Sequence, residues 1–473
     1  MSVKIPRLVI AGLSGDSGKT VVSLSLINSL RRKGYSVSVF KKGPDYIDAA
    51  WLGTAAGTVC RNLDTYMVTP EIVFATFFRN ASKTDISIIE GNRGIFDGKD
   101  LIGTHSTSGL AGLLQAPVVL VINVSKVTRT VAAIISGCIS FDPNVRIAGV
   151  ILNKVAGKRH QKIITESIEK YCGIPVLGAV PKLGEDASLI PGRHLGLITP
   201  AEFNSSHEFS DLLTEIGEKY LDIEKLVEIA GTASLLDDTG ESGEKEIPAN
   251  VKIGYFKDSI FTFYYPENLE ALERSGAELV PVSSTDDKHL PDIDGLYIGG
   301  GFPETQADRL MSNHSMMMSV REASQNGMPI YAECGGLIYL SRSIIWNDNN
   351  YPMAGIFPID LKMNLKPAGH GYAEVLIDKD NPFFDTGDTV RGHEFHYSSL
   401  ESSSTAPNSC MAVETGAGIG GGRDGLLLKN TLATYTHIHA DGVAGWAPAF
   451  VNKALAYKKN INGRVTGSSR VAV

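Results

Sequence analysis

A glycine-rich segment near the start of the chain, residues 12–20 (GLSGDSGKT), has the residue types of a phosphate-binding loop. Glycines let backbone N–H groups turn toward an anion, and the N-terminus of a following helix favours negative charge. Lys19 adds a positive charge, and the Thr20 hydroxyl can coordinate Mg²⁺. Five residues rather than the usual four separate Gly12 from Gly18, so a plain Gly/Ser turn is the alternative. We predict nucleotide binding, with contacts from Gly12, Ser14, Gly15, Ser17, Gly18, Lys19 and Thr20.

Carboxylates follow two further apolar runs of the same part of the chain. Asp45 lies in KKGPDYIDAAW, and Glu90 ends the run ISIIE. Ligands of open α/β sheets gather at the carboxyl ends of the strands, and Mg²⁺ takes hard oxygen ligands. We therefore predict Asp45 and Glu90, with Thr20, as ligands of Mg²⁺, and the alternative is that they are ordinary polar loop residues.

A cysteine in the second half of the chain has the surroundings of a nucleophile. Cys334 lies between an apolar run and two glycines in PIYAECGGLIYL, the strand–nucleophile–helix order of a nucleophile elbow. The helix N-terminus is expected to lower the pKa of this thiol. Its base would be His437 or His439, which alternate along a predicted strand and so face opposite sides. The segment GGGFPE provides either an oxyanion donor or a tight turn.

The elements that must position these residues follow an α/β order. Continuous Val/Ile/Leu runs, as in buried parallel strands, occupy residues 7–12, 36–40, 86–90, 118–123, 147–153 and 176–181. A second such set begins at residue 251, after an acidic Gly/Ser-rich stretch at 235–250. The domains predicted are 1–200, which binds ATP, 201–250, a helical segment and linker, 251–460, which carries Cys334, and 461–473, a flexible tail.

Bulk composition excludes several classes of protein. A chain of 473 residues exceeds the size of one hydrophobic core, about 250–300 residues. The net charge of −8 provides no basic surface for nucleic acid. No apolar run reaches the roughly 20 residues of a membrane span, and the N-terminus lacks the features of a signal peptide. We expect a cytoplasmic protein without nucleic-acid or membrane partners.

The motifs together resemble the CbiA-type cobyrinic acid a,c-diamide synthases over nearly the whole chain. The resemblance rests on GLSGDSGKT, KKGPDYIDAAW, RNLD, IEGNRGIFDG, GGGFPE, AECGG, GHEFHYS and YTHIHA, in this order. It implies an α/β fold in which a dethiobiotin-synthetase-like P-loop domain with a doubly wound sheet precedes a class I glutamine amidotransferase-like domain. It also implies ATP, Mg²⁺ and L-glutamine as reactants or cofactors, a tetrapyrrole as substrate, and a homodimer as one assembly that the sequence allows.

The resemblance also implies roles for single residues. Cys334 would be the glutaminase nucleophile and His437 its base. His439 occupies the position where class I glutaminases usually carry a Glu, so the third member of the triad stays open. Asp48 and Asp97 would contact the substrate carboxylate and its activated intermediate, and Asn153 would contact adenine. GHEFHYS is expected to face the tetrapyrrole.

The identity of the tetrapyrrole depends on two positions. Members acting on cobyrinic acid commonly read KVGPDYIDP and EGVMGLFDG, whereas this chain has Lys42 and Arg93 in the corresponding segments. In carrying these two cations, the segments resemble those of the related nickel-sirohydrochlorin a,c-diamide synthases. The resemblance implies that Lys42 and Arg93 would bind extra carboxylates of the substrate. Cobyrinate is the first choice and nickel-sirohydrochlorin the alternative. A cobyric acid synthase, and a P-loop switch protein with a non-catalytic glutaminase-like module, are the other readings considered.

Overall fold

The computed structural model describes residues 2–182, 192–193, 196–203, 206–237, 247–401 and 408–468. The chain forms two compact units. The first consists of Met1–Thr65 and Thr69–Glu241, and the second of Tyr66–Val68 and Ser242–Val473. Among the described residues, no helix has the length and apolar character that crossing a membrane requires.

A seven-stranded parallel sheet forms the centre of the first unit, in the order β4-β3-β5-β2-β6-β7-β8. All six apolar runs predicted as strands are strands of this sheet, which confirms the doubly wound prediction for this half. The strand β4 was not expected, because its three residues form no apolar run. The bounds are β2 (Arg7–Gly12), β3 (Val37–Lys42), β4 (Arg61–Leu63), β5 (Ile86–Glu90), β6 (Val118–Asn123), β7 (Ile147–Val155) and β8 (Val176–Pro181).

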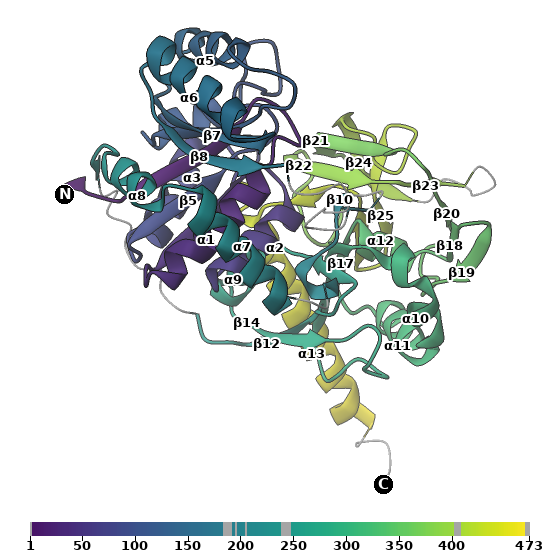
Figure 1. Cartoon of the computed structure of the whole chain (residues 1–473). Helices are drawn as coiled ribbons and strands as arrows, with labels where there is room; N and C mark the ends of the chain where they lie inside the picture. The colour runs from purple at the N-terminus through teal and green to yellow at the C-terminus, as the bar shows by residue number, and fades with distance from the viewer. Residues whose placement is uncertain are drawn as a thin grey trace. The chain divides into compact units, whose positions relative to one another are not determined.

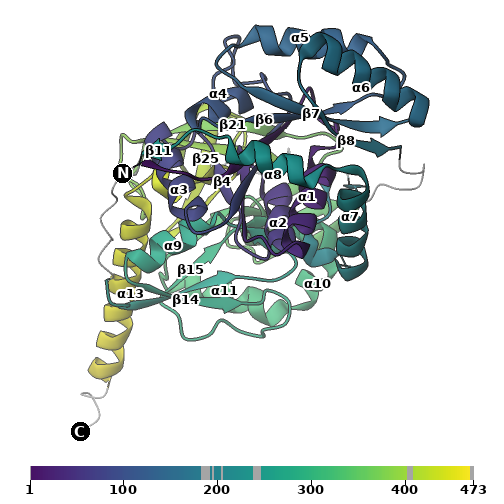
Figure 2. The ribbon, with the colours of Figure 1, turned by 60° about the vertical axis from the view of Figure 1, so that its left-hand side comes forward.

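Helices cover both faces of this sheet. One face packs against α1 (Lys19–Arg32), α2 (Tyr46–Ala56), α7 (Ser206–Tyr220) and α8 (Ile223–Gly231), whose apolar side chains join one core. The helices α5 (Thr130–Phe141) and α6 (Lys158–Cys172) lie together on the other side of the sheet (Figure 2). The remaining elements are α3 (Pro70–Ala81), α4 (Thr107–Leu113), η1 (Pro200–Glu202), and the strands β1 (Ser2–Val3), β9 (Gly192–Arg193), β10 (Gly196–Leu197) and β11 (Leu236–Asp237).

The helical segment that the sequence analysis set apart as part of 201–250 lies in the first unit. Phe209, Leu213 and Leu226 are buried in the core shared with α1 and α2. Such apolar stripes need a partner surface, and α1 provides it. Residues 238–246, most of the predicted acidic linker, lie outside the described residues.

A ten-stranded mixed sheet forms the second unit, in the order β14-β12-β15-β17-β26-β25-β24-β21-β22-β27 (Figure 1). The strands from β14 to β26 are parallel, and the others join antiparallel. The bounds are β12 (Val251–Phe256), β14 (Ala277–Val282), β15 (Gly295–Ile298), β17 (Ile330–Glu333), β21 (Gly369–Ile377), β22 (Thr389–His396), β24 (Ser409–Thr415), β25 (Arg423–Leu428), β26 (Thr431–Thr434) and β27 (His437–Ile438).

Helices and smaller sheets complete the second unit. Trp446 and Phe450 of α13 (Trp446–Ser468) pack with Tyr331 of β17 in the core beside α9 (Pro266–Arg274). The helix continues through 461–468, part of the expected flexible tail, and 469–473 lie outside the described residues. The other elements are α10 (Ala307–Ser312), α11 (His314–Gln325), α12 (Gly335–Leu340), η2 (Pro303–Gln306), η3 (Ala440–Gly442), β13 (Phe261–Phe263), β16 (Gly300–Gly301), β18 (Ser343–Trp346), β19 (Asn349–Pro352), β20 (Asp360–Met363) and β23 (Ser398–Leu400).

Candidate active site

The predicted phosphate-binding loop connects β2 to α1, as the motif requires. Gly18 caps α1 with φ of 94°, a conformation that glycine adopts without strain. A Cβ on Gly12 would overlap the Ser17 hydroxyl, so this position also needs glycine. Residues 14–16 form an exposed crest. The loop is thus closed tightly at its base and accessible at its top, where an anion would bind.

Lys19 lies buried beneath this loop. Its Nζ donates to the carbonyl oxygens of Ser14 and Arg93, each at 2.9 Å. Burial lowers the pKa of Lys19, and the nearby cation of Lys41 lowers it further, against the pull of surrounding carboxylates. A bound phosphate would provide the missing negative charge.

Thr20 and Glu90 lie together at the carboxyl edge of the sheet, as predicted. The Thr20 hydroxyl donates to Oε1 of Glu90 at 3.0 Å. Glu90 is 0% exposed, and its second oxygen, Oε2, lies by the Ser23 hydroxyl without a hydrogen bond of normal geometry among the described residues. A buried carboxylate oxygen of this kind fits a cation ligand. Among the described residues, three or more His, Cys, Asp or Glu side chains nowhere gather closely enough to hold a metal by themselves. A Mg²⁺ ion here would therefore need phosphate oxygens and water as well.

Lys41, which the sequence analysis did not single out, joins the predicted acidic residues. It is 1% exposed, and its Nζ lies 2.8 Å from Glu90 Oε1, 2.5 Å from Asp48 Oδ2 and 3.9 Å from Asp45 Oδ2. Register explains the arrangement, because Lys41 of β3 pairs with Glu90 of β5. The first lysine of KKGPDYID, at a strand end, was the available signal.

The residues of this ion cluster have pKa values shifted in different directions. Burial lowers the pKa of Lys41, but the carboxylates around it outweigh burial and hold the pKa well above its ordinary value. Burial and the charge of Asp48 raise the pKa of Asp45 to about 7. Burial alone would raise the pKa of Asp48, but the Lys41 ammonium lowers it below the ordinary value. Asp48 is thus the partner of Lys41, and Asp45 is the carboxylate less tied to it.

Local structure also fixes Asp45 and Asp97. Asp45 caps α2, and its Oδ1 accepts from the Asp48 amide at 2.9 Å. Asp97 lies in an exposed turn after β5, where its Oδ2 accepts from the Gly94 amide at 2.8 Å. Both carboxylates keep one oxygen outside these backbone contacts.

The remaining predicted residues of the first unit lie around the same edge. Burial lowers the pKa of Lys42, Asp64 raises it, and the cation of Arg93 lowers it. Arg93 is exposed, with φ of 49°. Asn153 donates from Nδ2 to the Ser17 carbonyl oxygen at 2.9 Å. This contact makes Asn153 a support of the phosphate-binding loop.

In the second unit, Cys334 occupies the predicted sharp turn between β17 and α12. Its φ of 47° and ψ of −96° are strained for a residue with a side chain, as in a nucleophile elbow. The Sγ lies 3.9 Å from the Phe395 carbonyl oxygen. A Cβ on Gly335 would lie 2.8 Å from the Gly301 nitrogen, so the GGGFPE segment lies directly beside the elbow.

The two candidate bases face different surroundings, as the alternation predicted. His437 has Nδ1 3.2 Å from Glu333 Oε2, and a Cβ on Gly300 would lie 3.3 Å from its Nε2. The ring of His439 instead packs on Tyr265 at 5.0 Å, and its Nε2 lies 3.6 Å from Glu267 Oε2. Gly300 adjoins Gly301, which contacts the elbow, so His437 lies on the Cys334 side.

The expected lowering of the Cys334 pKa is wrong for this structure. The side chain is 4% exposed, and burial raises the pKa of the thiol well above its ordinary value, with a further rise from Glu304. A hydrogen bond between the Gly335 backbone and the thiol lowers the pKa of Cys334, but by less than burial raises it. The thiol is therefore protonated, and a base must remove its proton when a substrate enters.

The GHEFHYS motif lies beside Cys334, which its expected role toward the tetrapyrrole did not anticipate. It runs along β22, where His393 pairs with His437 of β27 and the two rings stack at 4.9 Å. Glu394 accepts from the Gly418 amide at 2.9 Å, and its charge contributes to the raised pKa of Cys334. The motif therefore helps to shape the cysteine site.

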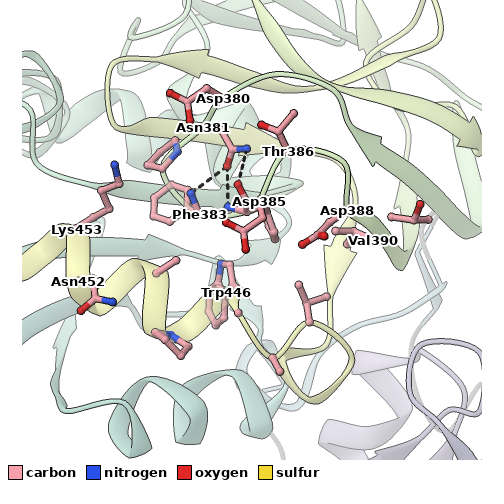
Figure 3. A pocket seen from close by; sticks show the side chains of 18 of the residues that line it. Asp380, Asn381, Phe383, Asp385, Thr386, Asp388, Val390, Trp446, Asn452 and Lys453 are labelled. Carbon is pink, nitrogen blue, oxygen red and sulfur yellow. Dashed lines mark hydrogen bonds between the residues drawn. The ribbon is translucent and has the colours of Figure 1, made fainter.

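A separate pocket of about 770 Å³ opens in the second unit between the β21–β22 connection and the start of α13 (Figure 3). Asp380, Asp385, Asp388 and Trp446 are among its lining residues. Asn381 shapes one wall by accepting from the amides of Phe383 and Phe384. None of the site residues predicted from the sequence lines it.

Two family models match the two halves of the chain. Residues 8–195 match the CobQ/CobB/MinD/ParA nucleotide binding domain. Residues 252–444 match the CobB/CobQ-like glutamine amidotransferase domain. These ranges contain the phosphate-binding loop and the cysteine elbow, respectively.

Curated relatives resemble the chain over nearly its whole length. A cobyrinate a,c-diamide synthase of Magnetococcus marinus is 41% identical over 454 residues, covering 95% of this chain and 97% of the relative. One from Archaeoglobus fulgidus is 42% identical over 460 residues, covering 97% and 99%. One from Methanosarcina acetivorans is 40% identical over 483 residues, covering 96% of each. The chain belongs to the cobyrinate a,c-diamide synthase family.

Proposed function

We propose that this protein is an ATP- and glutamine-dependent ligase that converts the a and c acetate carboxylates of cobyrinate into carboxamides. The observation that carries the proposal is the strained elbow of Cys334, with His437 against the adjoining glycine strand, in a chain that also holds a phosphate-binding loop over Lys19. A glutaminase alone would not need the phosphate-binding loop, and a nucleotide-binding protein alone would not need the cysteine elbow.

In the first unit, the residues orient a nucleotide and a substrate carboxylate. The loop amides and Lys19 would bind the phosphates of ATP, and Asn153 would hold the loop through Ser17. Thr20, Glu90 and Asp45 would hold Mg²⁺, which when bound neutralises charge on the transferred phosphoryl group. A substrate carboxylate attacks the γ-phosphate, ADP leaves, and the resulting acyl phosphate is the amidation target.

In the second unit, the residues release ammonia from glutamine. His437 removes the proton of Cys334, and the thiolate attacks the side-chain amide. The Gly301 amide, whose nitrogen would lie 2.8 Å from a Cβ on Gly335, would stabilise the oxyanion. Ammonia leaves, water hydrolyses the thioester to glutamate, and ammonia then displaces phosphate from the acyl phosphate.

One observation supports nickel-sirohydrochlorin as a second candidate substrate. Burial and the cation of Arg93 lower the pKa of Lys42 by more than Asp64 raises it, and this balance favours an anionic ligand with carboxylates beyond the reacting one. Asp48 and Asp97 would then face the reacting carboxylate. We keep cobyrinate first, because the three relatives reported above carry that name.

Mass spectrometry of products separates these candidates. The protein is incubated with ATP, Mg²⁺ and glutamine, and with cobyrinic acid or nickel-sirohydrochlorin. Two successive losses of about one mass unit on cobyrinic acid are expected, because each acid becomes an amide. The same losses only on nickel-sirohydrochlorin would replace the substrate, and Lys42→Ala and Arg93→Ala should then abolish them.

A glutaminase assay tests the class of protein. Wild type should release glutamate from glutamine in the presence of ATP and the tetrapyrrole, and Cys334→Ala should not. Ammonium chloride should still drive amidation in Cys334→Ala, because the first unit is intact. Absence of glutamate release by wild type would favour a switch protein with a non-catalytic module. Cytoplasmic location and a homodimer stay predictions from the sequence.

A further inference from the structure

The carboxylate next to the nucleophile lies completely inside the second unit. Glu333 is the last residue of β17, is 0% exposed, and directly precedes Cys334. Its Oε2 accepts from the Tyr297 hydroxyl at 3.1 Å, and its Oε1 accepts from the Ile438 amide at 3.3 Å. Tyr297 is itself held by Asn268 at 3.2 Å. A buried carboxylate with several donors is a fixed acceptor.

The third donor to this carboxylate is the ring of His437. Nδ1 lies 3.2 Å from Glu333 Oε2. Donation from Nδ1 places the ring proton on that side and leaves Nε2 as an acceptor. A His base in an acyl-transfer site needs this tautomer, because Nε2 must be bare to take the proton of the nucleophile.

Two further contacts hold the ring in position. Its face stacks on His393 with an interplanar angle of 18°. The edge of the ring formed by Cε1 and Nε2 lies against Gly300, where a Cβ would be 2.5 Å from Cε1. The ring therefore cannot turn over without breaking the contact to Glu333.

The usual third member of the triad would stand at position 439, which holds a histidine. His439 faces away from this cluster, toward Glu267 at 3.6 Å. Among the described residues of the second unit, three buried His–Glu pairs lie within 3.6 Å, namely His437–Glu333, His439–Glu267 and His396–Glu394. Of their carboxylates, Glu333 is the one that directly precedes the nucleophile.

We propose that Glu333 is the positioning residue of the glutaminase, taking the place of the missing triad carboxylate by fixing the tautomer and orientation of His437. The inference rests on the proposed function. In this arrangement the nucleophile and the residue that orients its base are neighbours in sequence, with Glu333 at the end of β17 and Cys334 at the elbow.

Glu333→Gln is the direct test, with Glu267→Gln as the matched control. The new amide can donate to Nδ1 and shift the ring proton to Nε2, where the base must be bare. We expect kcat for glutamine hydrolysis to fall by about 100-fold or more, as when the carboxylate of a catalytic triad is replaced by its amide. KM for glutamine should change less than about twofold, because Glu333 contacts His437 rather than substrate. Glu267→Gln should keep kcat within about threefold of wild type.

The outcomes separate the inference from the proposed function. Amidation driven by ammonium chloride should be unchanged in both variants. A Glu333→Gln protein with kcat within about threefold of wild type would overturn the inference, and so would an equal loss of kcat in both variants. If wild type itself releases no glutamate, the proposed function fails instead.

A milder variant protects the test against misfolding. Tyr297→Phe removes one hydrogen bond to Oε2 and leaves the carboxylate in place. If Glu333→Gln does not fold, Tyr297→Phe should still lower kcat by about threefold to tenfold at constant KM, the effect of one hydrogen bond. An unchanged kcat in a folded Tyr297→Phe protein would count against the inference.

Discussion

Replacing Lys41 by methionine should destabilise the first unit strongly. Lys41 is the cation that three carboxylates share, at 2.5, 2.8 and 3.9 Å from Asp48, Glu90 and Asp45. Methionine keeps an unbranched side chain that is one atom shorter, and it removes the charge and the donors. Breaking a buried ion pair by removing one partner costs about 3–5 kcal/mol, because the other charge stays buried.

The adjacent Lys42 provides a matched control. It is also buried, but burial and Arg93 lower its pKa by more than Asp64 raises it, whereas the carboxylates around Lys41 outweigh burial. Lys42→Met removes a charge that its surroundings disfavour on balance, so the free energy of unfolding should fall by less than in Lys41→Met, although Asp64 loses a nearby cation. The same substitution at two neighbouring lysines should therefore give losses of clearly different size in the same assay.

Urea unfolding in EDTA, followed by hydrogen exchange of peptides from β3 and β5, reports on the first unit alone. A loss of 3 kcal/mol also corresponds to a fall in Tm of about 6–12 °C for a domain of this size. Adding Asp48→Asn to Lys41→Met should restore part of the loss, because it removes one orphaned charge. The reasoning is refuted if Lys41→Met stays within 1 kcal/mol of wild type, or if Lys42→Met loses as much.

Three further outcomes test other parts of the molecule. Alkylation of Cys334 by iodoacetamide, followed by peptide mass spectrometry, should stay slow at pH 8 and keep rising above pH 10, since a raised pKa keeps the thiol protonated; a plateau below pH 9 would contradict this. Gly301→Ala should lower the stability of the second unit by about 3 kcal/mol in urea melts, because the new Cβ overlaps the Ile260 carbonyl oxygen; an unchanged midpoint would show that the strand shifts freely. Asn153→Ala should weaken ATP binding about threefold to tenfold by calorimetry, since the loop loses the bond to Ser17, and an unchanged affinity would remove that role.

Local sequence patterns predicted the framework of both units. Buried parallel strands appear as continuous apolar runs, so β2, β5 and β6 could be located without the structure. The elbow could be located because a cysteine between a strand and two glycines leaves few conformations for the chain. In both cases the information lies within about ten residues of the chain.

Properties that depend on distant residues could not be predicted. The helix after Cys334 suggested a lowered pKa, but Glu304 lies 30 positions earlier in the chain, and burial is a property of the whole unit. The partner of His437 was also hidden, since Glu333 lies 104 positions away. Sequence patterns identify the groups, while the sign of their electrostatic interaction depends on tertiary structure.

Each site contains two residues of the same type that lie close together in sequence but face different surroundings. Lys41 lies among Asp45, Asp48 and Glu90, whereas Lys42 lies near Asp64 and Arg93, because successive residues of a strand point to opposite sides. His437 meets Glu333 and His439 meets Glu267 across a short strand and the turn after it. A slip of one residue in the pairing of β3 with β5 would place Phe40 or Lys42 opposite Glu90 in place of Lys41. The register of these strands is therefore under a chemical constraint as well as a packing constraint, because the observed register places Lys41 among three carboxylates that would otherwise lack this cation.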